Sequence, residues 1–331
     1  MRSEIRRVAL LGAGVIGAGW AARLVENGID VAIADPDPEV RRKTEAVLGN
    51  AERAMRGLFP EPPARRGVVV YADSVEAAVD GADFVQESAP EREDLKRALL
   101  ARADAVAPAD VILGTSTSGL LPSRLQADCV HPGRVVVGHP FNPVYLLPLV
   151  EVCGGSATAP ETVEAAMAFY ASLGMHPLHV RTEIDGFIAD RLLEALWREA
   201  LHLVNDGVAT TDEIDRAVHY GAGLRWAFMG TFGIYRLAGG EAGMRHFMAQ
   251  FGPALKLPWT RLEAPELTDA LIDRVSEQAE EQAGGRSVRD MERSRDDALV
   301  AILQALEGQG IGAGIELARW RANRRSASES G

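Results

Sequence analysis

Residues 135–152 (VVVGHPFNPVYLLPLVEV) place a histidine, His139, and a glutamate, Glu151, in two short apolar runs that flank a proline-rich turn. The three prolines exclude a helix across the middle, so the pattern predicts strand, turn, strand. A turn of this length can bring the carboxylate back to the imidazole. A carboxylate on one ring nitrogen fixes the tautomer of a histidine and stabilises its cationic form, as a general base requires. On these residues alone, a surface histidine beside a solvent-facing glutamate remains the alternative.

A second polar turn, residues 114–119 (GTSTSG), follows a strand predicted at residues 111–113. The ligand crevice of an open parallel sheet lies at the carboxyl ends of its strands. Hydroxyl groups in this turn are therefore well placed to donate to a substrate oxygen. The alternative is that they cap the helix expected after Leu121.

A glycine-rich turn at residues 12–17 (GAGVIG) lies between a strand predicted at residues 5–11 and a helix predicted at residues 18–27. In this position it forms the fingerprint of a dinucleotide-binding unit. The first glycine allows the tight turn, the second lets the backbone approach a pyrophosphate, and the third lets the helix pack close to the strand. The helix N-terminus supplies free N–H groups and a positive dipole end. The predicted cofactor contacts in this turn are Gly12, Gly14, Val15, Ile16 and Gly17.

An acidic residue, Asp35, ends the next predicted strand, residues 29–34. It stands about 20 residues beyond the glycine motif, as the fingerprint expects. Its carboxylate suits a ribose 2′-hydroxyl and would repel a 2′-phosphate, so NAD is favoured over NADP as the cofactor. Arg41 and Arg42 follow closely and leave open a contact with a 2′-phosphate.

Composition excludes several classes of function. The chain has 331 residues, 47% apolar and 25% charged, which is typical of a globular protein of two domains. The net charge of −12 disfavours a nucleic acid partner, which needs a basic face. We expect no secretory signal and no membrane span, because no apolar run reaches about 18 residues. The two cysteines lack metal-site spacing, and we expect no metal and a reducing, cytoplasmic location.

Strand and helix patterns alternate up to about residue 183, and only helical patterns follow. The predicted fold class is α/β: a Rossmann-type, doubly wound, mostly parallel sheet followed by an all-helical C-terminal domain. We expect an NAD-binding domain at residues 1–183 and a helical substrate and dimerisation domain at residues 184–331. Its helices are predicted at residues 186–204, 211–220, 267–282 and 293–306, with a frayed polar tail from about Arg319.

Four ordered motifs, GAGVIGAGWA, GTSTSG, GHPFNPVYLLPLVEV and DGFIADRLL, resemble the 3-hydroxyacyl-CoA dehydrogenase superfamily over essentially the whole chain. The resemblance implies an NAD-binding Rossmann domain, a helical domain that forms a homodimer, and a catalytic His–Glu pair. By position it assigns catalysis to His139 and Glu151, with Ser116 bonding the reacting oxygen and Asn142 in the H-x-x-N-P turn. Glu87 and Lys96 match positions beside the nicotinamide end of the cofactor.

Two departures from the superfamily concern the substrate. Where its members usually show G-F-x-x-N-R, this chain has Asp190 in place of the asparagine. Residues 59–67 (FPEPPARRG) are too short and proline-rich for the lysine-bearing segment that clamps coenzyme A in acyl-CoA members. The resemblance therefore favours a small, free 3-hydroxy acid.

Two branches of the superfamily use free acids, and residues 221–232 (GAGLRWAFMGTF) resemble the one whose substrate carries a quaternary ammonium and a carboxylate. Aromatic faces, sometimes with a carboxylate, bind quaternary ammonium ions. The predicted substrate contacts are Asp190, Arg225, Trp226 and Phe232, with Trp226 beside Arg225 in a glycine-flanked turn. Helix packing is the alternative for most of these aromatics. A sugar acid, an acyl-CoA substrate, or an idle NAD-binding structural protein remain the alternatives for function.

Overall fold

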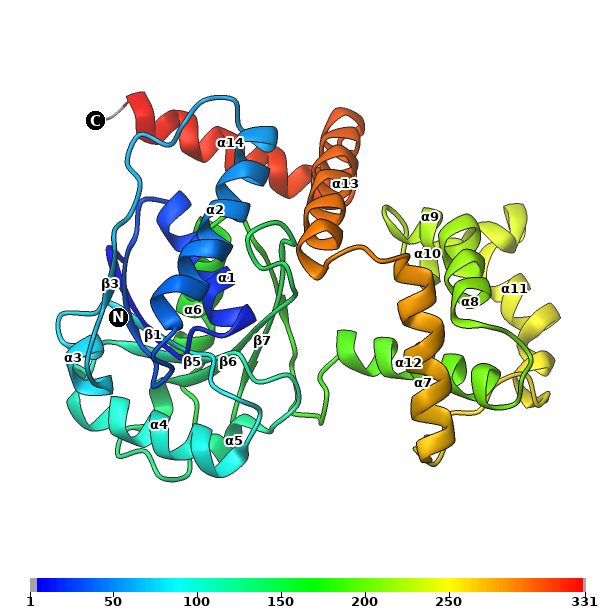
Figure 1. The fold of residues 1–331 in the computed structure, drawn as a ribbon, viewed down its shortest axis with the longest axis horizontal. Helices are drawn as coiled ribbons and strands as arrows, with labels where there is room; N and C mark the ends of the chain where they lie inside the picture. The colour runs from blue at the N-terminus through cyan, green and yellow to red at the C-terminus, as the bar shows by residue number, and fades with distance from the viewer. Residues whose placement is uncertain (1–4, 330–331) are drawn as a thin grey trace. The chain divides into compact units, whose positions relative to one another are not determined.

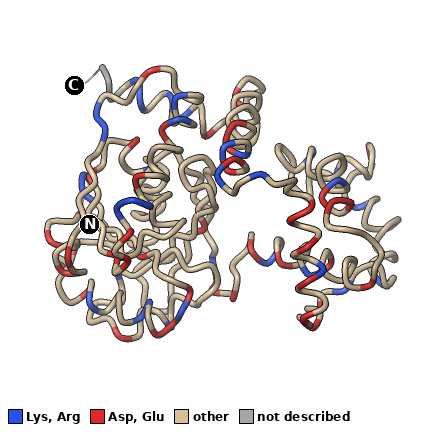
Figure 2. Tube along the Cα trace, in the orientation of Figure 1, with Lys and Arg blue, Asp and Glu red and all other residues tan. Residues whose placement is uncertain are grey.

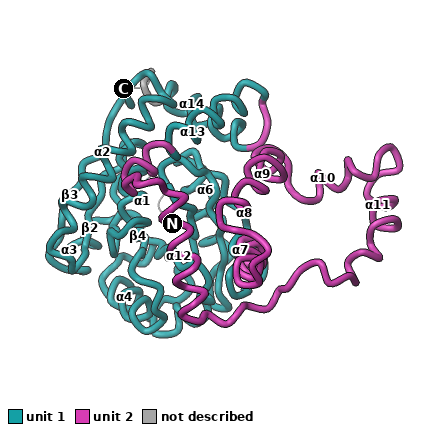
Figure 3. Tube along the Cα trace, turned by 45° about the vertical axis from the view of Figure 1, so that its right-hand side comes forward, with its two compact units in different colours: residues 1–190, 295–309, 313–331 teal, residues 191–294, 310–312 magenta. Residues whose placement is uncertain are grey.

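The computed structural model describes residues 5–329, with side chains up to residue 326. The chain forms two compact units, shown in Figure 3. Unit 1 comprises residues 1–190, 295–309 and 313–331, and unit 2 comprises residues 191–294 and 310–312. The division near residue 190 lies close to the predicted boundary. The chain after this division is helical, as predicted, but residues 295–309 and 313–331 pack in unit 1 rather than in unit 2.

Unit 1 is built on one eight-stranded sheet with the order β3-β2-β1-β4-β5-β6-β7-β8 (Figure 1). Neighbouring strands are parallel except β6 and β7, which are antiparallel. The predicted doubly wound, mostly parallel sheet is confirmed. Its strands are β1 (Arg7–Leu11), β2 (Asp30–Ala34), β3 (Val69–Tyr71), β4 (Phe84–Glu87), β5 (Ile112–Thr115), β6 (Val135–Pro140), β7 (Leu149–Gly154) and β8 (His176–His179).

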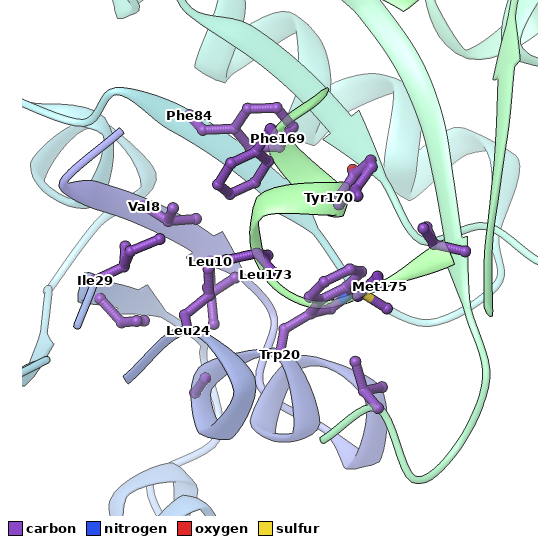
Figure 4. Packing of buried hydrophobic residues seen from close by; sticks show 14 of the residues in the cluster. Val8, Leu10, Trp20, Leu24, Ile29, Phe84, Phe169, Tyr170, Leu173 and Met175 are labelled. Carbon is purple, nitrogen blue, oxygen red and sulfur yellow. The ribbon is translucent and has the colours of Figure 1, made fainter. Parts of the chain in front are cut away.

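Helices cover both faces of this sheet. On β1, Val8 and Leu10 belong to a buried cluster with α1 (Val15–Glu26) and α6 (Pro160–Ser172), which Figure 4 shows from close by. The alternate residues, Ala9 and Leu11, join a second buried cluster on the other face. That face carries α3 (Val75–Val79), α4 (Glu93–Val106) and α5 (Pro122–Leu125). Burial on both faces explains why β1 reads as a continuous apolar run rather than an alternating one.

The C-terminal tail corrects a prediction. Instead of fraying from Arg319, the chain forms α14 (Ala313–Glu329), which packs with α13 (Val288–Gln309) on α2 (Val40–Leu58). Trp320 is only 2% exposed, and its ring centre lies 4.8 Å from that of Phe59. Its Nε1–H donates to Asn27 Oδ1 at 2.8 Å. Leu317 and Trp320 lie one helical turn apart and form a narrow apolar stripe. Because most other residues of the tail are polar, its overall composition did not reveal this stripe.

The helices of unit 2 are α7 (Ala189–Asn205), which begins in unit 1, α8 (Thr211–Ala217), α9 (Gly223–Trp226), α10 (Thr231–Ala238), α11 (Gly243–Phe251) and α12 (Asp269–Ala283). Of these, α9, α10 and α11 were not predicted from the sequence. The predicted turn at Arg225 and Trp226 is wrong, since both residues lie in α9. Helix α7 starts three residues later than predicted because Phe187 adopts a φ of 47°, which interrupts a helix.

Segment 59–68 between α2 and β3 contains no helix, as its prolines predict. Among residues 5–329, no single helix is long and apolar enough to cross a membrane; α13 and α14 reach that length and composition only as a pair bent by 88°. Acidic and basic residues are interspersed along the chain, so the net charge of −12 is spread over many elements (Figure 2).

Candidate active site

The antiparallel pairing of β6 with β7 places His139 opposite Glu151. Nδ1 of His139 lies 3.0 Å from Oε2 of Glu151, and both side chains are buried. The strand, turn, strand prediction is therefore confirmed, and the turn returns the carboxylate to the imidazole. A surface pair facing solvent is excluded.

The second oxygen of Glu151 is bound by the backbone that follows the sheet. The N–H groups of Ile188 and Ala189 each donate to Oε1 at 2.9 Å. Burial alone would raise the pKa of Glu151, but the bonds from His139 and from these two N–H groups lower it below its ordinary value of 4.5. The carboxylate stays ionised and accepts only, so Nδ1 of His139 carries the proton and Nε2 offers its lone pair to a substrate hydroxyl.

This backbone support was not predicted. It depends on Phe187, which is fully buried, packs 5.9 Å from the His139 ring and turns the chain toward Glu151 with its positive φ. The Gly-Phe pair in the DGFIADR motif was the available sequence signal. The same segment brings Oδ2 of Asp190 to 3.8 Å from Nε2 of His139, with the Asp190 side chain 27% exposed. Carboxylates thus flank both ring nitrogens, and the more exposed one lies on the reactive side.

Ser116 follows the last residue of β5, at the same edge of the sheet as His139 at the end of β6. Its Oγ accepts from Nε1–H of Trp20 at 3.0 Å and from the amide of Gln86 at 2.8 Å, and lies 2.9 Å from Oγ of Ser88. The hydroxyl is nearly buried rather than free in a polar turn. Sequence reasoning missed Trp20 and Gln86, since their partner is 96 and 30 residues away and neither shares a motif with it.

A groove at the carboxyl edge of β1 and β2 gathers most of the predicted cofactor residues. Its lining includes Gly12, Gly14, Val15, Ile16 and Asp35. Each carboxylate oxygen of Asp35 accepts one backbone N–H, from Ala13 at 2.7 Å and from Asp37 at 2.8 Å. Its remaining lone pairs can accept from ribose hydroxyls.

The glycines of this turn behave as their positions predict. A methyl group on Gly17 would overlap the carbonyl of Gly12, whereas one on Gly14 would meet open space. No side chain caps the N-terminus of α1, so its N–H groups are available to a pyrophosphate. The residues present therefore fit NAD. Arg41 stacks on Tyr71 at 4.3 Å and Arg42 bonds Glu39 at 2.6 Å, so both arginines have partners within the protein.

Glu87 and Lys96, which were expected beside the nicotinamide end of the cofactor, bond to each other in the structure. Both side chains are buried, and Nζ of Lys96 bonds Oε1 of Glu87 and the carbonyl of Ala89, each at 3.0 Å. Glu87 also accepts from Thr115 Oγ1 at 2.5 Å. In this conformation the pair holds the loop after β4, and direct contact with the cofactor remains a prediction.

The remaining predicted residues are exposed. Asn142 lies on the turn between β6 and β7. Arg225, Trp226 and Phe232 belong to unit 2, where Trp226 and Phe232 are 45% and 82% exposed. Their roles in binding remain predictions.

The sheet order and the groove define the class, a dinucleotide-binding protein built on a Rossmann sheet. Family models of the 3-hydroxyacyl-CoA dehydrogenase NAD-binding domain and C-terminal domain match residues 7–184 and 186–283. The chain belongs to the 3-hydroxyacyl-CoA dehydrogenase family, and its cofactor is NAD.

Known proteins of high similarity cover nearly the whole chain. L-carnitine dehydrogenase from Pseudomonas aeruginosa is 62% identical over 304 residues, which cover 92% of this chain and 95% of that protein. L-carnitine dehydrogenase from Oceanobacillus iheyensis is 52% identical, with 92% and 99% covered. Among solved structures, 5-formyl-3-hydroxy-2-methylpyridine 4-carboxylic acid 5-dehydrogenase, an NAD+-dependent dismutase, is similar with a TM-score of 0.78 and 29% identity, covering 92% of this chain and 99% of that chain.

Proposed function

We propose that this protein oxidises L-carnitine to 3-dehydrocarnitine with NAD. The observation that carries the proposal is the 62% identity to an L-carnitine dehydrogenase over 92% of the chain. The geometry supports the same chemistry, because a buried His–Glu pair and a serine hydroxyl lie at the carboxyl edge of a sheet that carries a dinucleotide groove.

In this proposal the residues act as follows. Nε2 of His139 takes the proton of the C3 hydroxyl as the carbonyl double bond forms. Glu151 holds the imidazole in the Nδ1–H tautomer and stabilises the imidazolium that results. Ser116 donates to the C3 oxygen and polarises the carbonyl in the reverse direction. NAD, when bound, supplies the acceptor for the hydride that leaves C3.

Asp190 is the proposed counter-ion of the trimethylammonium group. That group sits one carbon from C3, so a hydroxyl held at Nε2 of His139 brings it close to a carboxylate 3.8 Å from the same nitrogen. Attraction between a quaternary ammonium and a carboxylate needs no hydrogen bond. In unit 2, the residues proposed for substrate binding are Arg225, as a partner of the substrate carboxylate, and Trp226 and Phe232, as aromatic faces for the cation.

We also propose that the protein is a cytoplasmic homodimer that associates through unit 2. Many of the large apolar side chains of this unit are exposed, and on α7 alone they are Leu192, Leu193, Leu196 and Trp197. These four positions have the spacing of one helix face, and an exposed apolar face of this kind is typical of a protein–protein interface.

The test is a substrate panel read as NADH formation: L-carnitine, D-carnitine, L-gulonate and a 3-hydroxyacyl-CoA. We expect turnover with L-carnitine alone. Because oxidation releases one proton, its equilibrium should shift toward NADH about tenfold per pH unit as pH rises. Turnover with L-gulonate but not L-carnitine would overturn the substrate, and no turnover with any compound would leave an idle NAD-binding protein.

A further inference from the structure

The Ser116 hydroxyl has more partners than a catalytic donor requires. A hydroxyl oxygen has two acceptor sites and one proton. Trp20 Nε1–H, which can only donate, occupies one site at 3.0 Å. The Gln86 amide contacts the same oxygen at 2.8 Å. If this amide also donates, both acceptor sites are filled, and the only role left to the hydroxyl is to donate its own proton.

The orientation of the Gln86 amide follows from its other neighbours. Its Nε2 lies 3.3 Å from the carbonyl of Gly138, which can only accept, so the NH2 group must face Gly138 and Ser116. Its Oε1 then faces the hydroxyl of Tyr170 at 2.7 Å, which donates. Burial raises the pKa of Tyr170, so this phenol keeps its proton. A chain of donors therefore runs in one direction, from Tyr170 through Gln86 to Ser116.

Two glycines of the sheet leave room for the hydrogen-bonded side chains of Tyr170 and Gln86. A methyl group on Gly138, next to His139, would overlap the Tyr170 hydroxyl. One on Gly114, at the start of the GTSTSG turn, would lie 2.6 Å from Oε1 of Gln86. Both glycines stand in motifs that hold the reactive residues, and the space they leave is filled by the Tyr170 hydroxyl and the Gln86 amide.

We propose that Trp20, Gln86 and Tyr170 are positioning residues that fix the Ser116 hydroxyl as a hydrogen-bond donor to the substrate oxygen. Ser88 Oγ, 2.9 Å away, accepts that proton before the substrate binds. When the substrate binds, its C3 oxygen takes the place of Ser88 Oγ as the acceptor, and Ser116 remains the donor. This inference rests on the proposed role of Ser116 and adds the residues that enforce it.

The test is a double-mutant cycle with Trp20→Phe and Ser116→Ala, followed as kcat for L-carnitine. Trp20→Phe keeps an aromatic ring and removes one N–H. We expect a loss of about tenfold in kcat with little change in KM. Because Trp20 is buried in the core, the smaller ring leaves a cavity and the melting temperature should fall, so kinetics are measured well below it. Ser116→Ala should cost roughly 10²–10³-fold. In the Ser116→Ala background, Trp20→Phe should cost nothing further, because its only route to the substrate is gone.

A second pair of variants changes the direction of the donor. Gln86→Met removes the amide, whereas Gln86→Glu presents a carboxylate that would capture the Ser116 proton. The glutamate variant should approach the loss of Ser116→Ala, and the methionine variant should resemble Trp20→Phe. NADH binding and the melting temperature, measured on each variant, identify any that fail to fold, and the Trp20 cycle decides the question independently.

Equal losses from Trp20→Phe in both backgrounds would overturn the inference and make Trp20 a packing residue only. Failure of the proposed function has a different signature, since the wild type itself would then not reduce NAD with L-carnitine. In that case the cycle is measured with the acid of the panel that the wild type oxidises. If it oxidises none, both proposals are wrong.

Discussion

Unit 1 and unit 2 differ in what they bury. The four buried apolar clusters found among the described residues all lie in unit 1, on both faces of the sheet and under α13 and α14. In unit 2 the buried apolar side chains are few: Leu201, Val204, Ile234 and Leu271. Its large apolar side chains are mostly exposed, as Trp259 is at 71%.

This difference suggests that unit 1 holds the reactive groups in place and that unit 2 provides surface for association. The polar groups of the reactive site lie on strand ends that close packing holds, so their distances and donor directions are set by unit 1. Unit 2 carries apolar surface without a core of comparable size, which a second copy or a substrate can cover. Reactivity and association should therefore respond to mutations in different units.

The largest effect is expected from His139→Gln. Removing the base should lower kcat for L-carnitine by roughly 10²–10⁴-fold, with the dissociation constant of NADH near that of the wild type. The matched control is His176→Gln, since His176 also pairs with a carboxylate, Glu316 at 3.1 Å, but on the surface. Steady-state kinetics and NADH fluorescence titration measure the two effects. Equal losses of turnover and NADH binding would show that His139 is structural.

Trp320→Ala tests whether the tail belongs to the core of unit 1. Its ring is buried, so truncation should lower the free energy of unfolding by about 3–5 kcal/mol. Trp259→Ala in unit 2, an exposed ring of the same size, should change it by less than about 0.5 kcal/mol. Denaturant unfolding compares the two variants. A large loss at Trp259 would show that its ring is buried, either within unit 2 or by a second copy of the chain.

Leu193→Arg tests the proposed dimer. An arginine at this exposed position on α7 would bury an unpaired charge in an apolar interface, and the dimer dissociation constant should rise at least about tenfold. Val130→Arg, at a 74% exposed site in unit 1, is the control and should leave the dimer unchanged. Light scattering after size-exclusion chromatography gives the mass. A monomeric wild type, or dimeric Leu193→Arg at every concentration, would contradict the proposal.

Asp190→Asn should raise KM for L-carnitine by about tenfold, the equivalent of about 1.4 kcal/mol of lost attraction to the cation. The comparison substrate is 3-hydroxybutyrate, which lacks the ammonium group. Its kcat/KM should stay constant or improve in the variant. The same loss with both acids would assign Asp190 to the chemistry at His139 instead of to cation binding.

The smallest effect concerns acid stability. Hydrogen bonds hold the pKa of Glu151 below its ordinary value of 4.5 in the folded state. A lowered pKa means that ionised Glu151 stabilises the fold above pH 4.5 and loses this contribution as pH falls through the folded-state value. The stability advantage of the wild type over Glu151→Gln should therefore shrink below pH 4.5 in urea unfolding. If the stability advantage of the wild type instead grows on acidification, folding raises the pKa of Glu151 and the prediction is wrong.

Local sequence patterns predicted most of the strands, helices and turns of unit 1. The alternation of strands and helices, the glycine turn and the proline-rich turn depend on backbone sterics and periodicity, which neighbouring residues determine. The tail was mispredicted because the two apolar residues that anchor it, Leu317 and Trp320, acquire meaning only against α2 and Phe59. Helices α9 to α11 escaped prediction because they are only 4 to 9 residues long and glycines lie between them.

The dinucleotide turn, the acid at Asp35 and the return of Glu151 to His139 could be predicted from sequence, because each lies within one strand–turn–strand or strand–turn–helix–strand unit of the chain. The groups that surround the reactive atoms could not be predicted and were found only in the folded structure. The N–H groups that bind Glu151 and the Trp20–Gln86 pair that binds Ser116 come from segments 30 to 96 residues away. Hydrogen bonds are directional and short, so such partners exist only once the sheet has brought its strand ends together.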